Sequence, residues 1–416
     1  MISVKEIQEA WQLLKPIVTR TPLQFNDRLS ELYEANIYLK REDLQIVRSY
    51  KLRGAYNKMS GLSPEQLANG VICSSAGNHA QGFAFACMAL KTNGIVYMPA
   101  TTTQQKIKRV KTLGKQYVEV RLTGDTYDDA FAEAIKISEA ENKAFIPPFE
   151  DEKVIAGQGT VGFEIFRDAP DFMEFDAIVL PVGGGGLSAG VGSFFKQKSP
   201  QTKVIGVEPA GAPAMFKSFQ TGKVECLESI DKFVDGAAVK KVGKINFEIC
   251  QQVLEPNIIL VDEGKVCSTI LELYNEDAIV AEPAGVLSIA ALEQLKEEIK
   301  GKNICCILSG GNNDITRMAE IKERSMLYEG LKHYFIIRLP QRAGALKEFL
   351  VNVLGPDDDI CFFEYTKKNS RNSGPIALGI ELRNRNDYTG LLKRMTETDV
   401  QYQTINDNPD LRTFLI

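Results

Sequence analysis

Short apolar runs, each followed by turn-forming residues, recur between about residues 70 and 320 of this 416-residue chain, with amphipathic stretches between them. Runs of this kind predict parallel strands that helices bury on both faces. We therefore expect an α/β fold built from doubly wound, mostly parallel sheets. The clearest runs are Val71–Cys73, Gly94–Met98, Ala177–Leu180, Val204–Val207 and Ile304–Leu308.

Three of these runs end in loops rich in glycine, serine and asparagine. The loops are Ser74–His79, Gly183–Gly186 and Ser309–Gly311. In doubly wound sheets, ligands bind beyond the carboxyl ends of the strands. The three loops are therefore expected to converge on one site.

Gly183, Gly184, Gly185 and Gly186 form an unbroken glycine run after a buried strand. The backbone N–H groups of such a run can turn toward one anion, and the helix that starts next adds its positive end. A plain flexible turn is the alternative, but four glycines lose much chain entropy on folding. A dinucleotide site is a second alternative, and the run fits the G-x-G-x-x-G spacing poorly. We interpret the run as a phosphate cradle.

Lys51 lies in the segment Ser-Tyr-Lys-Leu-Arg-Gly and is a candidate for Schiff-base formation with pyridoxal phosphate. This role needs a neutral amine, and the nearby cations Arg48 and Arg53 would favour the neutral form. An isolated lysine is weak evidence, because most lysines are solvated surface residues. The loop Ser74–His79 has two equally supported interpretations, because a helix start there can bind a substrate carboxylate or can be an ordinary N-cap.

The composition argues against several classes of protein. The chain has 49 Lys and Arg against 54 Asp and Glu, a formal net charge of −5, so no basic field would draw nucleic acid. No apolar run approaches the roughly 18 to 20 residues that span a bilayer, and we expect a cytoplasmic protein without membrane contact. The two histidines, His79 and His333, leave little for a zinc site or a Ser-His-Asp triad.

The pattern changes near residue 325, where strand-like and helical stretches follow one another in the order βαββαβ. We expect two domains, a catalytic one over residues 1–325 and a smaller one over residues 326–416. The expected elements of the second domain are Lys332–Leu339, Ala345–Val353, Ile360–Tyr365, Ile376–Leu382, Tyr388–Met395 and Tyr402–Ile405.

Taken in order along the chain, these motifs resemble the threonine deaminases (threonine dehydratases). These are fold-type II pyridoxal phosphate enzymes with a tryptophan synthase beta-like fold. The resemblance covers residues 20–314. The matching segments are Arg20–Leu23, Lys40–Asp43, Ser49–Ala55, Ser74–Gly82, Ala156–Thr160, Gly183–Gly190, Asp235–Val239, Glu282–Gly285 and Ser309–Asn312.

The resemblance implies a role for each site residue. Lys51 would form the internal aldimine with pyridoxal 5'-phosphate and then act as the base that removes the substrate's α-proton. Asn78 would hydrogen-bond the cofactor's 3-oxygen, and Ser309 would face its pyridine nitrogen. The phosphate would be held by Gly183, Gly184, Gly185, Gly186 and Leu187, and the substrate carboxylate by Ser75, Ala76, Gly77 and Asn78.

The implied activity is deamination of L-threonine to 2-oxobutanoate and ammonia, the first step of isoleucine biosynthesis. A serine beside the pyridine nitrogen would leave the ring largely neutral, which favours prompt loss of the β-hydroxyl. Related racemases have a serine at the position of Ala76, so this chain favours elimination over racemisation. Their cation-binding segment corresponds to Glu208–Ala214, which here ends in alanine, and no metal is expected there.

The second domain resembles the ACT-like regulatory domain of biosynthetic threonine deaminases, present as a single copy. The resemblance implies feedback inhibition by isoleucine, with valine as a second candidate effector that would oppose it. Arg342–Leu346 lies where such domains often contact an effector, and a simple helix start explains it equally well. Related enzymes are commonly homo-oligomers, so a dimer or tetramer is expected.

Two other classes of function, another enzyme of the same fold type and a protein without catalysis, stay open on the sequence alone. The chain could act on L-serine as a serine dehydratase, or be another fold-type II enzyme such as a threonine synthase, since one methyl group changes binding by only about 1 to 3 kcal/mol. It could also be an amino-acid sensor without catalysis. The intact set of Lys51, Asn78, the four glycines and Ser309 argues against a sensor.

Overall fold

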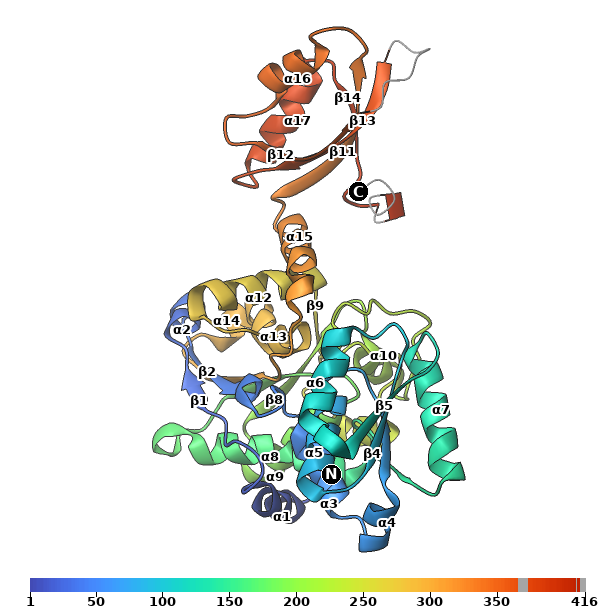
Figure 1. Cartoon of the computed structure of the whole chain (residues 1–416). Coiled ribbons are helices and arrows are strands. Elements are labelled where there is room, and N and C mark those ends of the chain that lie inside the picture. Colours follow the sequence, from blue (N-terminus) through green and yellow to red (C-terminus); the bar gives the residue numbers. More distant parts are fainter. Residues whose placement is uncertain (366–372, 409, 412–416) are drawn as a thin grey trace. The chain divides into compact units, whose positions relative to one another are not determined.

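A computed structural model of the chain describes residues 1–365, 373–408, 410 and 411 (Figure 1). It divides into two compact units, Met1–Ile315 and Thr316–Ile416. The assignment of residues 1–325 to catalysis and 326–416 to regulation stays a prediction. Among the described residues, no helix is both long and apolar enough to cross a membrane.

The larger sheet of the first unit has six strands in the order β1-β2-β10-β7-β8-β9. β1 runs antiparallel to β2, and the other neighbours are parallel. The mostly parallel sheet predicted from the apolar runs is therefore confirmed. The strands are β1 Leu23–Phe25, β2 Asn36–Arg41, β10 Asn303–Leu308, β7 Ala177–Pro181, β8 Lys203–Pro209 and β9 Ile259–Val261.

The smaller sheet of this unit has four parallel strands in the order β5-β4-β3-β6. Every residue of β3, β4 and β7 is buried, because helices cover both faces of each sheet. This burial explains why these strands are continuous apolar runs in the sequence. The strands are β5 Val118–Leu122, β4 Gly94–Met98, β3 Val71–Ser74 and β6 Ala144–Phe145.

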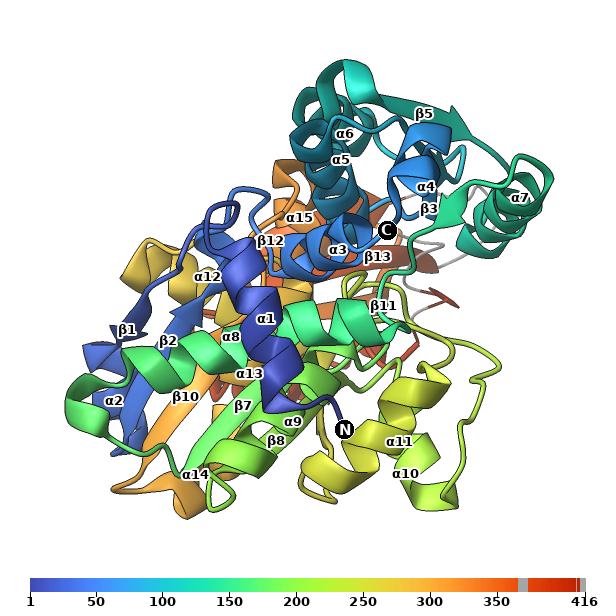
Figure 2. The same ribbon diagram turned by 90° about the horizontal axis from the view of Figure 1, so that it is seen from below.

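Fourteen helices surround the two sheets in the first unit, and α1, α8 and α9 pack side by side (Figure 2). Local sequence sets their starts: Ser3 and Glu6 form a capping box on α1, and Asp151 caps α8. The helices are α1 Val4–Leu14, α2 Asp27–Tyr33, α3 Lys51–Ser60, α4 Pro64–Asn69, α5 Asn78–Leu90, α6 Gln104–Gly114, α7 Tyr127–Ala140, α8 Glu152–Asp168, α9 Gly186–Lys198, α10 Ala214–Thr221, α11 Lys244–Val253, α12 Glu263–Asp277, α13 Pro283–Ala290 and α14 Leu292–Ile299.

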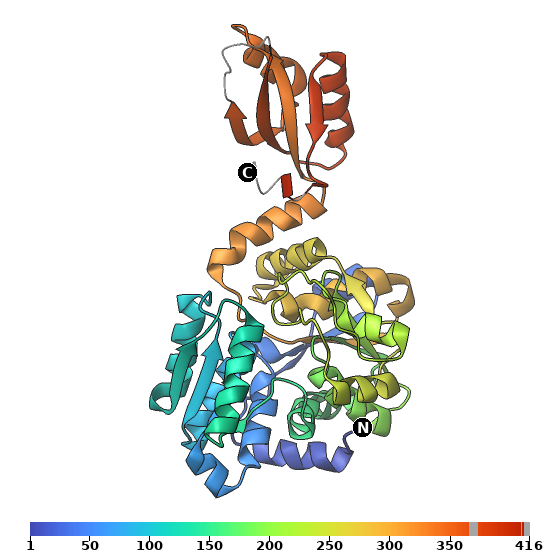
Figure 3. The ribbon, with the colours of Figure 1, turned by 90° about the vertical axis from the view of Figure 1, so that its right-hand side faces the viewer.

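The second unit is an antiparallel sheet in the order β12-β13-β11-β14, with two helices on one face (Figure 3). The predicted βαββαβ order is confirmed. Phe335, Leu378 and Met395 lie in its apolar core. The elements are α15 Met318–Tyr328, β11 Lys332–Pro340, α16 Ala345–Val353, β12 Asp359–Tyr365, β13 Ser373–Glu381, α17 Asp387–Glu397 and β14 Gln401–Thr404.

Candidate functional site

One pocket of the first unit brings together residues from loops at the carboxyl ends of three strands. Lys51, Asn78, Gly183 and Ser309 line it, together with Glu282. Asn78 follows β3, Gly183 follows β7 and Ser309 follows β10. The geometry places these four predicted residues at one location. Gly184–Leu187 and Ser75–Gly77 do not line the pocket directly, but continue the same loops.

Lys51 is the first residue of α3 and reaches into the pocket. Its Nζ donates a hydrogen bond to the carbonyl of Pro148 at 3.0 Å and lies 5.4 Å from the centre of the Tyr50 ring. Burial lowers the pKa of Lys51 from 10.5 to about 8, with the charge of Glu282 opposing part of this shift. About a tenth of the amine is therefore neutral at pH 7, far more than for an ordinary lysine.

A neutral form of Lys51 was predicted from the sequence, but the predicted cause, repulsion by nearby cations, was wrong. The sequence suggested repulsion from Arg48 and Arg53, whereas removal of the amine from water is the dominant cause. Arg53 has no part in this effect because its charge is fully engaged elsewhere, with Glu42 and Glu164.

Glu282 is the pocket residue whose importance sequence reasoning missed. It precedes α13 and is only 6% exposed. Burial, followed by the nearby charge of Asp235, raises the pKa of Glu282 from 4.5 to about 7, while a hydrogen bond from Asn78 opposes the rise. The sequence signal was its place in the Glu-Pro-Ala-Gly segment, to which no role had been attached.

Asn78 begins α5, and both ends of its amide are hydrogen-bonded. Its Nδ2 donates to Oε1 of Glu282 at 2.5 Å. Its Oδ1 accepts from Nδ2 of Asn312 at 2.7 Å, and the same Nδ2 donates to the carbonyl of Val47 at 2.8 Å. The orientation of the Asn78 amide is therefore fixed from two sides.

The glycine run joins β7 to α9 in a tight loop that leaves no room for side chains. A Cβ atom at Gly184 would overlap the ring of Phe149, and Gly185 has a φ of +90°, which favours glycine. Asn246 braces the loop by donating from Nδ2 to the carbonyl of Gly184 at 2.6 Å. The first backbone bond of α9 runs from Ala189 N to the Gly185 carbonyl, so the N–H groups just before Ala189 precede the helical ladder.

Ser75, Ala76 and Gly77 form the half-buried turn between β3 and α5. The backbone N–H of Gly77 donates to Oγ of Ser75 at 3.2 Å. Within the part of the chain that the structure describes, no atom beyond Gly77 itself, its two chain neighbours and the adjoining helix backbone lies within 4 Å of the Cβ position at Gly77. This turn therefore offers open space beside the N-terminus of α5, where an anion is favoured.

Ser309 is buried at the end of β10, and its Oγ donates to the carbonyl of Ala284 at 3.3 Å. The next residue, Gly310, faces Glu282 so closely that a Cβ atom there would overlap the carboxyl oxygen. This close approach explains the glycine, and it couples the Ser309 loop to the start of α13.

Comparisons with known proteins agree with this arrangement. Residues 14–310 match the family described as pyridoxal-phosphate dependent enzymes, and residues 323–415 match the C-terminal regulatory domain of threonine dehydratase. The chain is 59% identical over 415 residues to the biosynthetic L-threonine dehydratase of Halalkalibacterium halodurans, covering 100% of this chain and 99% of that one. The chain belongs to the biosynthetic threonine dehydratase family. Its similarity to the Bacillus subtilis (strain 168) member is 57% identity over 416 residues, covering 100% of this chain and 98% of that one.

A solved threonine deaminase has a similar fold over most of this chain. The processed form of threonine deaminase isoform 2 from Solanum lycopersicum is 41% identical, with a TM-score of 0.73, covering 78% of this chain and 90% of that one. Membership makes pyridoxal phosphate the cofactor, as the sequence predicted. The pocket fits this group, since it combines a partly neutral lysine with a side-chain-free glycine cradle at a helix N-terminus.

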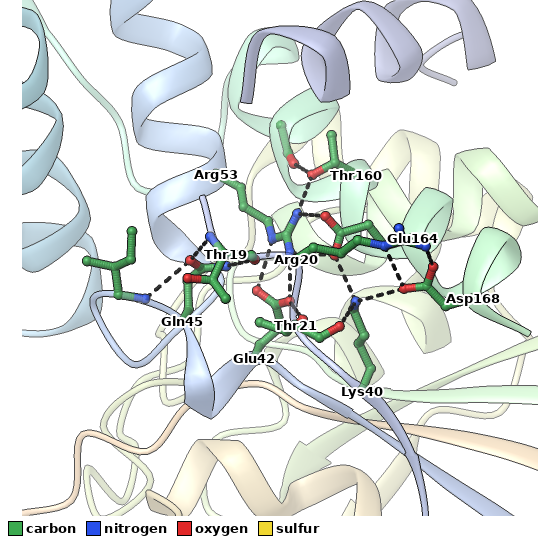
Figure 4. A network of polar contacts seen from close by, with 12 residues as sticks. Thr19, Arg20, Thr21, Lys40, Glu42, Gln45, Arg53, Thr160, Glu164 and Asp168 are labelled. Atoms are coloured by element: carbon green, nitrogen blue, oxygen red, sulfur yellow. Dashed lines mark hydrogen bonds and ion pairs between the residues drawn. The ribbon is translucent and has the colours of Figure 1, made fainter. Parts of the chain in front are cut away.

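A buried ion network surrounds Arg53 of α3 (Figure 4). Arg53 donates two hydrogen bonds to the carboxylate of Glu42, at 2.9 and 2.8 Å, and two to that of Glu164, also at 2.9 and 2.8 Å. Lys40 adds a bond to Glu164 at 2.7 Å. We call these four residues the Arg53 network. None is more than 2% exposed, and they tie α3 to β2 and α8.

Charge is balanced within the Arg53 network, which holds two cations and two carboxylates. Burial opposes ionisation of Arg53, but Glu42 and Glu164 raise its pKa above the ordinary value. Burial likewise would raise the pKa of Glu164, but Arg53 and Lys40 lower it below the ordinary value. Arg53 and Glu164 therefore stay charged, and the network fixes the helix whose first residue is Lys51.

The two remaining expectations concern His79 and a metal. His79 is buried with Nε2 2.9 Å from the carbonyl of Ile146, and burial, followed by the charge of Lys51, lowers its pKa to about 3. Glu208 accepts backbone hydrogen bonds from Met215 and Phe216, each at 2.8 Å. Among the described residues, no group of three His, Cys, Asp or Glu side chains is arranged to hold a metal. The absence of a metal in this protein stays a prediction.

Proposed function

We propose that this chain deaminates L-threonine to 2-oxobutanoate and ammonia with pyridoxal phosphate, as the first step of isoleucine biosynthesis. The observation that carries the proposal is the meeting of Lys51, Asn78, Gly183 and Ser309 in one pocket. The curated relatives that match the whole chain are named as biosynthetic L-threonine dehydratases.

Four parts of the pocket would hold the cofactor, which supplies an electron sink for the α-carbanion when bound. Lys51 would bind it covalently, and the N–H groups of Gly183–Leu187 would hold its phosphate. Asn78 would hydrogen-bond its 3-oxygen through Nδ2. Ser309 would face the pyridine nitrogen with a hydroxyl, which leaves that nitrogen without the protonating carboxylate that an aspartate would provide.

Lys51 would also be the base of the reaction. A base must be neutral to take a proton, and a pKa of about 8 leaves part of the amine neutral at pH 7 and most of it above pH 8. Lys51 would take the α-proton of the substrate once the substrate amine has displaced it. The loop Ser75–Asn78 would receive the substrate carboxylate at the N-terminus of α5.

The overall reaction balances without an oxidant. The α-proton and the β-hydroxyl leave threonine as water, and the released enamine rearranges to an imine. A second water hydrolyses this imine to 2-oxobutanoate and ammonia. No redox cofactor and no metal is needed for these steps.

The proposal is tested by giving the purified, cofactor-loaded protein three substrates separately: L-threonine, L-serine and O-phosphohomoserine. A threonine dehydratase yields 2-oxobutanoate from threonine with the highest kcat/KM. A higher kcat/KM for serine, with pyruvate as product, would support the serine dehydratase alternative. Formation of threonine from phosphohomoserine would identify a threonine synthase.

Regulation by isoleucine forms the second part of the proposal. It is supported by the match of residues 323–415 to the regulatory domain of threonine dehydratase. Coupling between two sites is typically worth about 1 to 3 kcal/mol, so isoleucine should weaken apparent threonine affinity roughly 5-fold to 150-fold. Valine should reverse part of this effect. Isoleucine that neither binds nor shifts the threonine curve would refute the regulatory role.

The assembly and location of the protein stay proposals. A homodimer or homotetramer is expected, and light scattering of the full chain would measure its mass in solution. Arg342–Leu346 remains a candidate effector contact, and its Arg342 side chain pairs with Glu348. The cytoplasmic location expected from the sequence also stays a prediction.

A further inference from the structure

A chain of hydrogen bonds fixes which atom of the Asn78 amide faces Glu282. The carbonyl of Val47 can only accept, so the Asn312 atom that contacts it at 2.8 Å must be Nδ2. The same Nδ2 contacts Asn78 at 2.7 Å, so the Asn78 atom there must be the acceptor Oδ1. Nδ2 of Asn78 is therefore left to face Glu282, to which it donates at 2.5 Å.

The Asn78 nitrogen lies among pocket residues. Both Asn78 and Glu282 line the pocket, as does Gly236, whose Cβ position is 4.0 Å from Nδ2 of Asn78. An amide nitrogen has two hydrogens, and the bond to Glu282 uses one of them. The second hydrogen is available to an acceptor bound in the pocket.

Within the described part of the chain, no capping role explains the burial of the Glu282 side chain. Glu282 stands at the N-cap of α13, but its side chain makes no capping hydrogen bond. Serine, threonine, aspartate and asparagine are the residues preferred for capping, and an uncompensated buried carboxyl is unfavourable. Its carboxyl instead accepts from Asn78 and from the backbone of Asn312.

Charged groups from several elements face Glu282. Lys51 of α3 interacts with it electrostatically. Asp235 and Lys106, which pair with each other at 2.8 Å, act on it with opposite signs. Lys106 belongs to α6, whereas Asp235 precedes the pocket residues Gly236 and Ala237. Glu282 is thus the buried carboxyl whose charge, when it is ionised, acts on the reactive lysine.

We propose that Glu282 is a positioning residue of this site, which holds the Asn78 amide in one orientation and places a negative charge beside Lys51. The inference rests on the proposed function for its consequence in catalysis. The effects of Glu282 on Lys51 and on Asn78 can be measured without substrate. The charge stabilises the protonated form of the Lys51 nitrogen, and the hydrogen bond presents Nδ2 of Asn78 to an acceptor in the pocket.

Two variants separate the two effects. E282Q keeps the size and one acceptor oxygen for Asn78 but removes the charge. E282L removes both the charge and the acceptor. D235N is the matched control, because it removes a carboxylate of the same region that is 42% exposed and leaves the Asn78 bond in place. Thermal unfolding checks that each variant folds, and if E282L does not, E282A takes its place, because it also removes both the charge and the acceptor.

The first measurement uses the protein freed of cofactor. The rate at which an amine-specific reagent labels Lys51 is followed against pH by peptide mass spectrometry. E282Q should move the midpoint to lower pH by about one unit, whereas D235N should move it less, since the charge it removes is more exposed. An unchanged midpoint in E282Q would overturn the electrostatic half of the inference.

The second measurement is the dissociation constant of pyridoxal phosphate, taken from its visible absorbance as it is added. E282L should bind at least about tenfold more weakly, as expected when a hydrogen bond to a charged group is lost, and E282Q should bind less weakly than E282L. Equal binding by wild type and E282L would overturn the positioning half.

Threonine turnover by the wild type is measured beside these two. If the wild type makes no 2-oxobutanoate while both shifts appear, the proposed function fails and the role of Glu282 stands. If the wild type is active and neither shift appears, the role of Glu282 fails alone.

Discussion

Arg53 and Lys51 are two cations on the same helix, α3, and their surroundings differ in kind. Arg53 is fully buried and makes four hydrogen bonds to the carboxylates of Glu42 and Glu164. Lys51 donates to one neutral carbonyl, and Glu282 acts on it only as a nearby charge. The pKa of Arg53 is raised, whereas the pKa of Lys51 falls to about 8.

This difference shows how one helix combines a rigid support with a reactive group. Carboxylates that bond both edges of a guanidinium keep it charged and hold the helix in place. A lysine that is removed from water and has no bonded carboxylate has a lower pKa. A larger fraction of its amine is then neutral and can act as a nucleophile or base. The same distinction separates Glu164, whose pKa is lowered, from Glu282, whose pKa is raised to about 7.

The largest effect is expected from removing the reactive cation. K51A should lower threonine turnover by at least about a thousandfold, because it removes both the covalent attachment and the base. Its unfolding midpoint should stay close to that of the wild type. The matched control is K58A, on the same helix but paired with Asp151. Turnover of K51A within tenfold of the wild type would exclude Lys51 from the mechanism.

Breaking the Arg53 network should instead cost stability. R53M leaves Glu42 and Glu164 buried without their main partner, which should lower the free energy of unfolding by about 3 to 5 kcal/mol. Denaturant unfolding followed by circular dichroism measures this loss. R20M is the control, since Arg20 pairs with Asp168 but is 55% exposed, and should change stability by less than about 1 kcal/mol. Equal losses of unfolding free energy in the two variants would show that the buried Arg53 network stabilises the fold no more than an exposed ion pair does.

Ionisation of Glu282 should make the free energy of unfolding depend on pH. The pKa of Glu282 is raised in the folded protein. Its stabilising contribution to the free energy of unfolding is therefore complete below pH 4.5 and is lost as the pH rises to about 7. E282Q lacks this loss. In cofactor-free protein, its stability relative to the wild type should therefore increase between pH 4 and pH 8, by on the order of 3 kcal/mol. A difference that does not change with pH would show that Glu282 ionises normally.

A smaller effect is expected from crowding the glycine cradle. In G184A the added methyl group would overlap the ring of Phe149 and displace the loop, which typically costs about 1 to 3 kcal/mol. The dissociation constant of pyridoxal phosphate should rise about tenfold. G61A is the control, because its nearest contact would be an ordinary 3.6 Å. Unchanged affinity in G184A would separate the cradle from phosphate binding.

Local patterns in the sequence were enough for the loops of the site and for five of the ten strands that the structure describes in the first unit. Apolar runs and turn residues located β3, β7 and β10, and the alternation after Lys332 placed the second unit, where α16 has the predicted bounds Ala345–Val353. The loops converged as expected, because carboxyl ends of parallel strands meet at one edge.

Long-range pairings were not accessible in this way. Glu282 gains its role from Asn78, 204 residues away, and Arg53 is engaged by Glu164, 111 residues away. No local pattern distinguishes a carboxylate that will pair with a buried arginine from one that will not. The expected effect of Arg53 on Lys51 was therefore wrong, and no role was predicted for Glu282.

We infer that this pocket, with its partly neutral lysine, deaminates threonine. The most direct test of this inference is to incubate the purified full chain, loaded with pyridoxal phosphate, with L-threonine and to quantify 2-oxobutanoate and ammonia together. We expect both products to form in equal amounts and both to disappear in K51A. A wild-type protein that binds the cofactor but releases neither product would contradict this inference.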